Sequence, residues 1–195
     1  MQIIGLTGGI ASGKSEVSRL FEELGIPIID TDQISRELVE PGSAALREIV
    51  DHFGDSVLNN DGSLDRKHLG RIIFASKQQR ERLEDILHPR IRDEVGRRLK
   101  GLDAPYAVVV IPLLVETRYP ISVDRILVID APRELQLQRL VQRNGISAAE
   151  ADNIISAQAA NSERLAAADD VLSNSGTLEE LRAEVKRLHA EYLLS

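Results

Sequence analysis

Four short stretches of the chain are almost continuously apolar, namely residues 3–7, 26–29, 106–111 and 126–129. Such runs are typical of strands that are covered on both faces in a parallel sheet, whereas a strand with one solvent-exposed face would alternate apolar and polar residues. A fifth, shorter strand is expected at residues 169–172. The pattern therefore predicts a parallel sheet of about five strands.

Between these runs the apolar residues recur at helical spacing. A helix is expected directly after the first run, and Gly25 would end it. Residues 33–100 contain mostly amphipathic helical segments, which predicts a helical insertion between the second and third strands. A last helix follows Thr177, which would form a capping box with Glu180.

The turn between the first strand and the first helix carries a phosphate-binding motif. Residues 8–15 read Gly-Gly-Ile-Ala-Ser-Gly-Lys-Ser and match the pattern Gly-x4-Gly-Lys-Ser/Thr. Glycines allow backbone N–H groups to converge on phosphate oxygens, and the following helix adds a positive dipole end. Lys14 would contact the phosphates of ATP and Ser15 would bind Mg²⁺. Strand, spacing and helix together favour this interpretation over a turn that only reverses the chain.

Carboxylates and arginines supply the other groups that phosphoryl transfer needs. The chain has no guanine-reading Asn-Lys-x-Asp segment, which argues against a GTPase. Asp30 and Asp32 follow the second strand, and Asp32 is the predicted base that orients an acceptor hydroxyl; helix capping is the alternative. Arg133, Arg139 and Arg143 follow the fourth strand, and the last two share a helix face. Their guanidinium groups form forked pairs of donors, which suit phosphate binding. The alternative is that these arginines only form a solvated, charged helix face.

Kinases of this type usually carry a second motif, in which a carboxylate contacts Mg²⁺ or the substrate, and two residues of this chain are candidates for it. Asp130 ends the fourth strand in the manner of a magnesium-binding aspartate. In kinases of this type, however, the strand beside the phosphate strand usually carries that motif, and here this strand is expected to lead to Glu116. Glu116 is therefore the candidate for binding Mg²⁺ through water or for positioning the substrate, with an ordinary surface carboxylate as the alternative.

Composition limits the partners. The 195 residues carry a formal net charge of −7, which argues against binding nucleic acid or anionic lipid through a broad basic surface. The absence of cysteine excludes disulfides and thiolate zinc sites. No export leader or membrane-spanning stretch is recognisable, so we expect a soluble, cytoplasmic protein. The sequence leaves its oligomeric state open.

Taken in order along the chain, several motifs resemble those of the dephospho-CoA kinase family. They are the segments 6–15, 29–36, 39–42, 87–89, 112–116 and 138–143, followed by Gln158, residues 168–171, Asn174 and Gly176. The phosphate loop alone is generic, but the ordered set is specific and runs nearly from end to end. The resemblance implies phosphorylation of the ribose 3′-hydroxyl of dephospho-CoA by ATP and Mg²⁺, which completes coenzyme A.

The same resemblance implies a domain organisation. It predicts an α/β, three-layer P-loop kinase fold with a central parallel sheet, a helical substrate-binding insertion and a short helical lid. The nucleotide-binding core would comprise residues 1–32, 89–134 and 163–195. The acceptor-binding insertion would comprise residues 33–88, and the lid residues 135–162.

The resemblance also assigns roles residue by residue. The catalytic residues would be Asp32, Lys14 and Arg139. The nucleotide-binding residues would be Gly9, Ile10, Ala11, Ser12, Gly13, Lys14, Ser15, Arg139, Arg143 and Asn174, with Ser15 as the metal ligand. The acceptor-binding residues would be Thr7, Asp32, Arg36, His88, Leu113 and Glu116.

Some positions leave a choice or depart from the family pattern. His88 fits a substrate contact and a structural histidine equally well, and Pro89 is expected mainly to start a helix. Ala11 replaces a frequent glycine, which is a small change. Asn161 stands where relatives often carry a basic residue, and Arg164 is the candidate that compensates for it.

Two other functions fit parts of the pattern. A kinase for another small acceptor, such as a nucleoside monophosphate or a metabolite alcohol, would share the sheet and differ only in the acceptor-side motifs. A regulatory or scaffold protein that binds ATP without transferring phosphate would keep the loop alone. The presence of Lys14, Ser15 and Asp32 with paired arginines argues against it, because a binding module has no use for an acceptor carboxylate.

Overall fold

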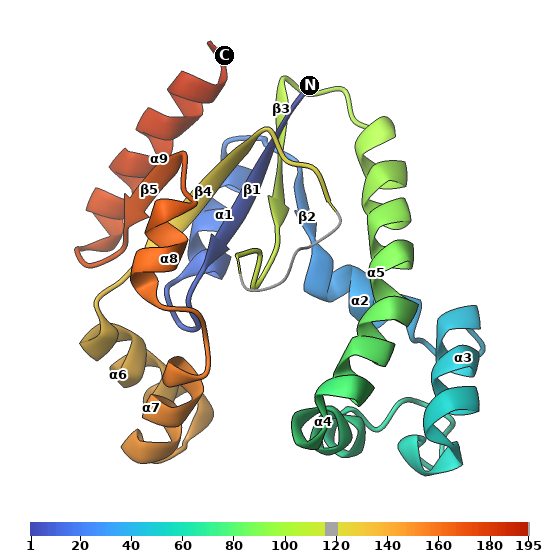
Figure 1. Cartoon of the computed structure of the whole chain (residues 1–195). Coiled ribbons are helices and arrows are strands. Elements are labelled where there is room, and N and C mark those ends of the chain that lie inside the picture. The colour runs from blue at the N-terminus through green and yellow to red at the C-terminus, as the bar shows by residue number, and fades with distance from the viewer. Residues whose placement is uncertain (116–120, 195) are drawn as a thin grey trace. The chain divides into compact units, whose positions relative to one another are not determined.

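The computed structural model describes residues 1–115 and 121–194. The chain forms two compact units, of which one comprises Met1–Asp30 with Leu102–Ser195 and the other comprises Thr31–Gly101. The first contains a sheet and the second is helical (Figure 1). The helical unit is thus a single insertion into the chain of the sheet unit.

The sheet has five parallel strands in the order β2-β3-β1-β4-β5. They are β1 (Gln2–Gly8), β2 (Ile28–Asp30), β3 (Tyr106–Val110), β4 (Arg125–Asp130) and β5 (Asp170–Ser173). This confirms the predicted parallel sheet. Because β1 lies between β3 and β4, its carboxyl end is where the strand order reverses, and ligands bind at that point in open α/β sheets.

Helices α1 (Lys14–Glu23) and α9 (Leu178–Tyr192) pack together against one face of the sheet (Figure 1). Their buried rings meet in an aromatic cluster, in which the ring centroids of Phe21 and Tyr192 both lie within 6.4 Å of Tyr106. Burying one such side chain stabilises the fold by about 1.5–3 kcal/mol. The predicted capping box at Thr177 and Glu180 is present at the start of α9.

Three helices lie between β4 and β5 in the sheet unit, all within the described residues. They are α6 (Arg133–Asn144), α7 (Ala148–Ser156) and α8 (Asn161–Ala166). Leu6 is in register with Val110 of β3, and Gly8 with Ile129 of β4. The loop that follows Gly8 therefore starts at the edge of the sheet where α6 also starts.

The helical unit has its own core. It contains α2 (Thr31–Leu38), α3 (Ala44–Phe53), the 3₁₀ turn η1 (Asp55–Val57), α4 (Arg66–Ala75) and α5 (Lys77–Lys100). The apolar positions predicted from helical spacing meet in one cluster, which includes Leu46, Ile49, Leu69 and Ile86. The expected insertion of residues 33–88 lies within this unit, and α5 continues beyond residue 88.

The expectation that Pro89 starts a helix is wrong, because Pro89 lies inside α5. An internal proline removes one helical hydrogen bond and crowds the preceding turn. Ile86, Ile91 and Val95 are nevertheless buried on both sides of it. Nearby, Arg90 Nη1 donates to the carbonyl of Ile86 at 2.5 Å. Burial of these apolar residues therefore outweighs the local cost of the proline.

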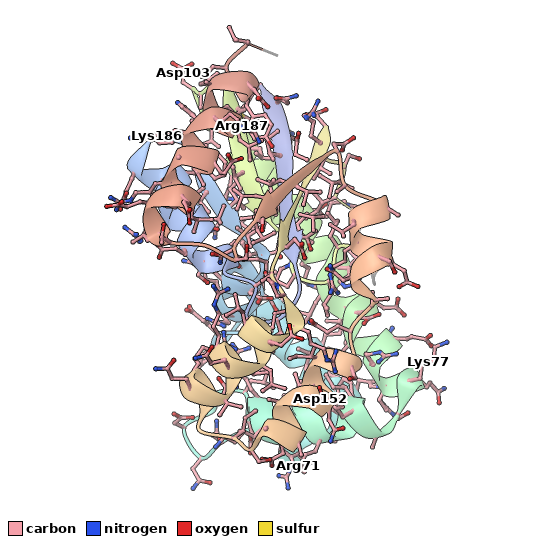
Figure 2. All side chains as sticks on the ribbon, turned by 90° about the vertical axis from the view of Figure 1, so that its left-hand side faces the viewer. Arg71, Lys77, Asp103, Asp152, Lys186 and Arg187 are labelled. Carbon is pink, nitrogen blue, oxygen red and sulfur yellow. The ribbon has the colours of Figure 1, made fainter. Side chains whose placement is uncertain are left out.

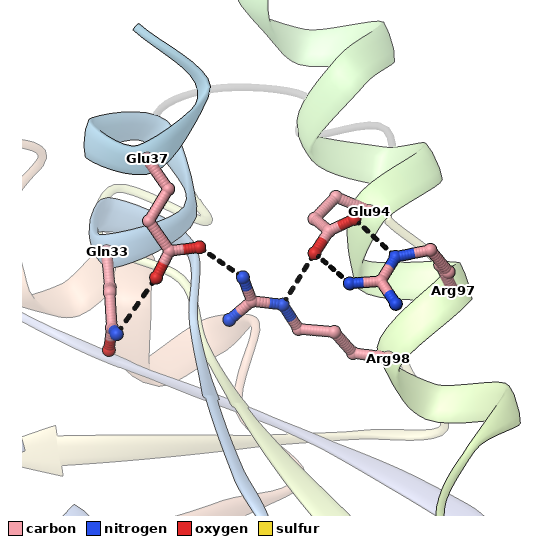
Figure 3. Close-up of polar contacts among 5 residues, drawn as sticks. All are labelled: Gln33, Glu37, Glu94, Arg97 and Arg98. Carbon is pink, nitrogen blue, oxygen red and sulfur yellow. Dashed lines mark hydrogen bonds and ion pairs between the residues drawn. The ribbon is translucent and has the colours of Figure 1, made fainter. Parts of the chain in front are cut away.

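Polar contacts join α2 to α5 within the helical unit (Figure 3). Glu37 on α2 accepts from Arg98 on α5 and also from Gln33 at 3.0 Å. Glu94 accepts from Arg97 at 2.6 Å and from Arg98 at 2.8 Å, and these hydrogen bonds lower the pKa of Glu94 from 4.5 to about 2. This network positions α2, the helix that carries Asp32.

Charged side chains project from the surface of the molecule (Figure 2). Many of them pair along one helix, as Arg187 does with Glu184 and Glu191 on α9. Exposed pairs of this kind add little stability, typically about 0–1 kcal/mol each. Within residues 1–115 and 121–194, no helix has the length and apolar character needed to cross a membrane.

Candidate active site

The phosphate loop connects β1 to α1 and has the backbone conformation that its glycines permit. Gly13 is the N-cap of α1, with φ of 104°, and no side chain caps the helix. The first backbone N–H groups of a helix have no acceptor within that helix, and the helix dipole is positive at this end. The start of α1 is therefore suited to bind an anion, as the motif predicts.

Amide side chains pack directly against the loop where glycine is required. A Cβ atom on Gly13 would lie 2.0 Å from Asn174 Nδ2, and one on Gly9 would lie 2.4 Å from Gln136 Nε2. Both distances are far shorter than a van der Waals contact. Any larger residue would displace these amides.

Lys14 and Ser15 begin α1 at the end of the loop. Lys14 Nζ donates to the carbonyls of Gly8 at 2.6 Å and Gly9 at 3.0 Å, so its ammonium group lies against the loop. Ser15 is exposed in the first turn. Two predicted site residues, Lys14 and Ser15, therefore both lie at the N-terminal end of α1.

Two buried hydroxyl groups at the loop, within the part of the chain that the structure describes, have no hydrogen-bond partner. They are Thr7 Oγ1 and Ser12 Oγ, and the two residues are 1% and 0% exposed. Buried polar atoms in proteins are nearly always hydrogen-bonded. The orphan hydroxyls therefore fit a loop that gains polar partners when a phosphate group or a hydrated cation binds.

Asn174 and Arg139 hold the loop at Ser12. Asn174 Nδ2 donates to the Ser12 carbonyl at 2.7 Å, while the guanidinium of Arg139 donates to the carbonyls of Ser12 at 3.5 Å and Asn174 at 3.0 Å. Arg143 is exposed near the end of α6 and donates to Asn144 Oδ1 at 3.0 Å. Of the two arginines predicted to bind the nucleotide, Arg139 therefore hydrogen-bonds to the loop, whereas Arg143 hydrogen-bonds to its neighbour on α6.

Two glutamines that contact the loop were not predicted as site residues. Gln136 Nε2 donates to the Ile10 carbonyl at 3.1 Å, and the Ile10 N–H donates to Gln158 Oε1 at 2.7 Å. Gln158 is one of the residues that carry the family resemblance, but the resemblance assigns it no role. Gln136 gave one weak signal, because it lies four residues before the buried Leu140 and so places an amide on the core-facing side of α6.

A cavity of about 540 Å³ lies beside the loop and is lined by residues of α6, α7, α8 and the end of β4. Arg164 lines this cavity, is only 4% exposed, and donates to the Ala159 carbonyl at 2.7 Å. A Cβ atom on Gly9 would lie 3.2 Å from Arg164 Nη2. Asn161 instead donates to Asp130 Oδ1 at 2.9 Å. Arg164 thus supplies a positive charge next to the loop.

The predicted acceptor-binding residues are distributed over both units. In the helical unit, Asp32 is exposed in the first turn of α2, Arg36 is exposed one turn later, and His88 is half-buried in α5. In the sheet unit, Thr7 is buried in β1 and Leu113 follows β3 with φ of 60°. A non-glycine residue in the left-handed backbone conformation is uncommon and often marks a functional turn.

Glu116 lies outside the described residues. Among those that are described, no group of three or more His, Cys, Asp or Glu side chains could hold a metal ion. Mg²⁺ commonly takes only one or two protein ligands and completes its shell with water and phosphate oxygens. The exposed hydroxyl of Ser15 fits such a role, and it is the ligand that the loop itself would supply.

Comparison with known proteins gives matches over almost the whole chain. A family model described as dephospho-CoA kinase matches residues 2–180. A protein of Thiobacillus denitrificans named dephospho-CoA kinase is 54% identical over 194 residues, which cover 99% of this chain and 96% of that protein.

Solved structures agree with these sequence matches. The crystal structure of TT1252 from Thermus thermophilus has a TM-score of 0.86 at 34% identity and covers 97% of each chain. A dephospho-CoA kinase from Campylobacter jejuni has a TM-score of 0.70 at 29% identity, covering 98% of this chain and 97% of its own.

Proposed function

Because this chain belongs to the dephospho-CoA kinase family, we propose that it transfers the γ-phosphoryl group of ATP to the ribose 3′-hydroxyl of dephospho-CoA, giving coenzyme A and ADP. The observation that carries this proposal is the family match over residues 2–180, which includes both the phosphate loop and the acceptor motifs. The loop alone would support only a P-loop kinase. The proposed place of this reaction is the cytoplasm.

On the nucleotide side, the loop residues from Gly9 to Ser15 would bind the phosphates of ATP. Lys14 would neutralise charge on the β- and γ-phosphates, and Ser15 would hold Mg²⁺, which neutralises further charge when bound. Ile10 already uses its N–H group for Gln158, so its part is to shape the loop. Arg139 and Arg164 would add positive charge where negative charge develops on the transferring phosphoryl group.

On the acceptor side, Asp32 would accept a hydrogen bond from the 3′-hydroxyl and take its proton late in the reaction. The new bond joins the 3′-oxygen to the γ-phosphorus while the bond from that phosphorus to the bridging oxygen of ADP breaks. A loose transition state asks little basicity of the carboxylate, so its main task is to orient the hydroxyl. The position of Asp32, two residues after β2 ends, supports this role.

Other acceptor contacts would come from residues away from the reacting hydroxyl. Arg36 is exposed on the same helix as Asp32 and would bind phosphate groups of dephospho-CoA. Thr7, His88, Leu113 and Glu116 are proposed as further contacts. The substrate is thus a small molecule held at several points, and remote contacts can improve the rate by fixing the hydroxyl in line.

Arg139→Ala is expected to lower the single-turnover transfer rate by about 100-fold and to weaken ground-state ATP binding less, because a guanidinium helps most where charge develops. Arg143→Ala should have the smaller effect, since Arg143 is exposed near the end of α6. Arg187→Ala on α9 is the matched control for loss of a surface arginine. Equal losses in rate and affinity for Arg139→Ala would make it an ordinary binding residue.

The acceptor assignment predicts that dephospho-CoA supports far faster ADP release than adenosine, AMP or shikimate at matched concentrations. Truncated acceptors lack the remote contacts, so they should lose turnover as well as affinity. The measurement is acceptor-dependent ADP release with all four compounds, followed by location of the new phosphate on the product by NMR.

Two outcomes would reject this assignment. One is a preference for AMP, adenosine or shikimate, and the other is a product phosphorylated anywhere but the ribose 3′ position. Either outcome would leave a P-loop kinase with a different acceptor. ATP binding without turnover of any acceptor would instead favour a regulatory protein.

A further inference from the structure

The tip of the phosphate loop is held between two glutamines from a distant part of the chain. Ile10 donates its N–H to Gln158 Oε1 at 2.7 Å and accepts from Gln136 Nε2 at 3.1 Å. Gln136 lies on α6 and Gln158 follows α7. One amide must accept and the other must donate, so the two hydrogen bonds fix the orientation of both side chains.

Apolar contacts join the same parts of the molecule. The side chains of Ile10 and Ala11 pack against the cluster formed by Leu140, Ala151 and Ile155 of α6 and α7. Gln136 is only 7% exposed, so its hydrogen bond to Ile10 is largely shielded from water. A buried amide that loses its partner is costly because water cannot replace the bond. Hydrogen bonds and apolar contacts therefore both connect the loop tip to α6 and α7.

The loop tip has a backbone conformation that needs such support. Ala11 has φ of 57°, in the left-handed region that non-glycine residues avoid. Strained conformations persist when their surroundings hold them in place. Here the residue before Ala11 is fixed by the two glutamines, and the residue after it, Ser12, is fixed by Asn174 and Arg139.

We propose that Gln136 and Gln158 are positioning residues that form a two-amide clamp on Ile10, and that this clamp couples nucleotide binding at the loop to the order of α6 and α7. The reaction it serves rests on the proposed function, but its effect on nucleotide binding does not depend on the acceptor. By linkage, the factor by which an ordered α6–α7 segment strengthens nucleotide binding is also the factor by which bound nucleotide favours the ordered segment.

The contrast between two identical substitutions gives the sharpest test. Gln158→Glu keeps an oxygen that accepts from the Ile10 N–H, whereas Gln136→Glu replaces a donor with a carboxylate that faces the Ile10 carbonyl. Both residues line the same cavity, so both variants add the same negative charge to it. We expect Gln136→Glu to bind ATP at least about tenfold more weakly than Gln158→Glu, the scale of one lost buried hydrogen bond.

Neutral variants test the coupling itself. Gln136→Met and Gln158→Met remove the hydrogen bonds without adding charge, and Gln142→Met is the control, because Gln142 is exposed on α6. Hydrogen exchange of α7 is measured with and without saturating ADP. Binding of ADP should slow exchange in α7 of the parent and of Gln142→Met, and should slow it at least about threefold less in the two clamp variants.

The result decides the proposal in either direction. Equal ATP affinities for the two glutamate variants, or undiminished protection of α7 by ADP in the methionine variants, would overturn it. If a methionine variant fails to fold, the glutamate pair still decides. The ATP affinities and ADP protection are read without an acceptor, so they remain informative if the acceptor assignment fails.

Discussion

Replacing Lys14 with alanine is expected to lower the rate of phosphoryl transfer about a thousandfold while the protein stays folded. Lys14 Nζ donates to the loop carbonyls of Gly8 and Gly9. In the proposed reaction this ammonium group would contact the transferring phosphoryl group. Negative charge on that group is neutralised by a fixed cation more effectively than by mobile water. The measurement is single-turnover transfer to dephospho-CoA together with the thermal midpoint of each variant.

The expected stability cost of Lys14→Ala, about 2 kcal/mol, is smaller than the roughly 4 kcal/mol of transition-state stabilisation that a thousandfold loss of rate represents. Lys14 belongs to none of the buried apolar clusters in the described part of the chain. Two lost hydrogen bonds cost about 1 kcal/mol each, and each kcal/mol lowers Tm by about 2–4 °C in a protein of this size. Lys186→Ala, on the exposed side of α9, is the control. A folded Lys14→Ala variant with near-parental turnover would refute the assigned role.

The sheet could be predicted because strands buried on both faces leave a simple mark in the sequence. In β3, for example, the neighbouring residues Val108 and Val109 are both 0% exposed, so the apolar run is continuous. The phosphate loop was equally readable, since its backbone conformation and charge demand particular residues at fixed spacing. Both features depend on short segments, which a single sequence displays directly.

The supports of the loop could not be predicted in the same way. The hydrogen bonds from Ile10 to Gln136 and Gln158 span 126 and 148 residues, and Asn174 reaches Ser12 across 162. No local spacing rule specifies such partners. Helical spacing placed Arg139 and Arg143 on one face, but it could not show that only Arg139 reaches the loop, which depends on how α6 packs. The partners of the phosphate loop therefore depend on long-range packing, which local sequence patterns do not specify.

Asp32→Asn is expected to bind ATP almost normally and to lose phosphoryl transfer by about two to four orders of magnitude, the usual scale for loss of a general base. Asparagine has nearly the same shape as aspartate but cannot take the proton of the acceptor hydroxyl. Asp32 lies in the first turn of α2, where a carboxylate also stabilises the helix by about 0.3–1 kcal/mol. That term would shift Tm by roughly 1–4 °C, so a folded but inactive variant is expected.

Two further variants separate the role of Asp32 from general effects of charge. Asp85→Asn removes an exposed carboxylate from α5 of the same helical unit and should leave transfer unchanged. Asp30→Asn removes the carboxylate at the end of β2 and should reduce transfer less than Asp32→Asn does. ATP affinity is measured by calorimetry with a non-hydrolysable analogue and Mg²⁺, and transfer by single turnover with dephospho-CoA. If ATP affinity collapses in Asp32→Asn while the transfer rate at saturation survives, Asp32 serves the metal and nucleotide, and another group must orient the 3′-hydroxyl.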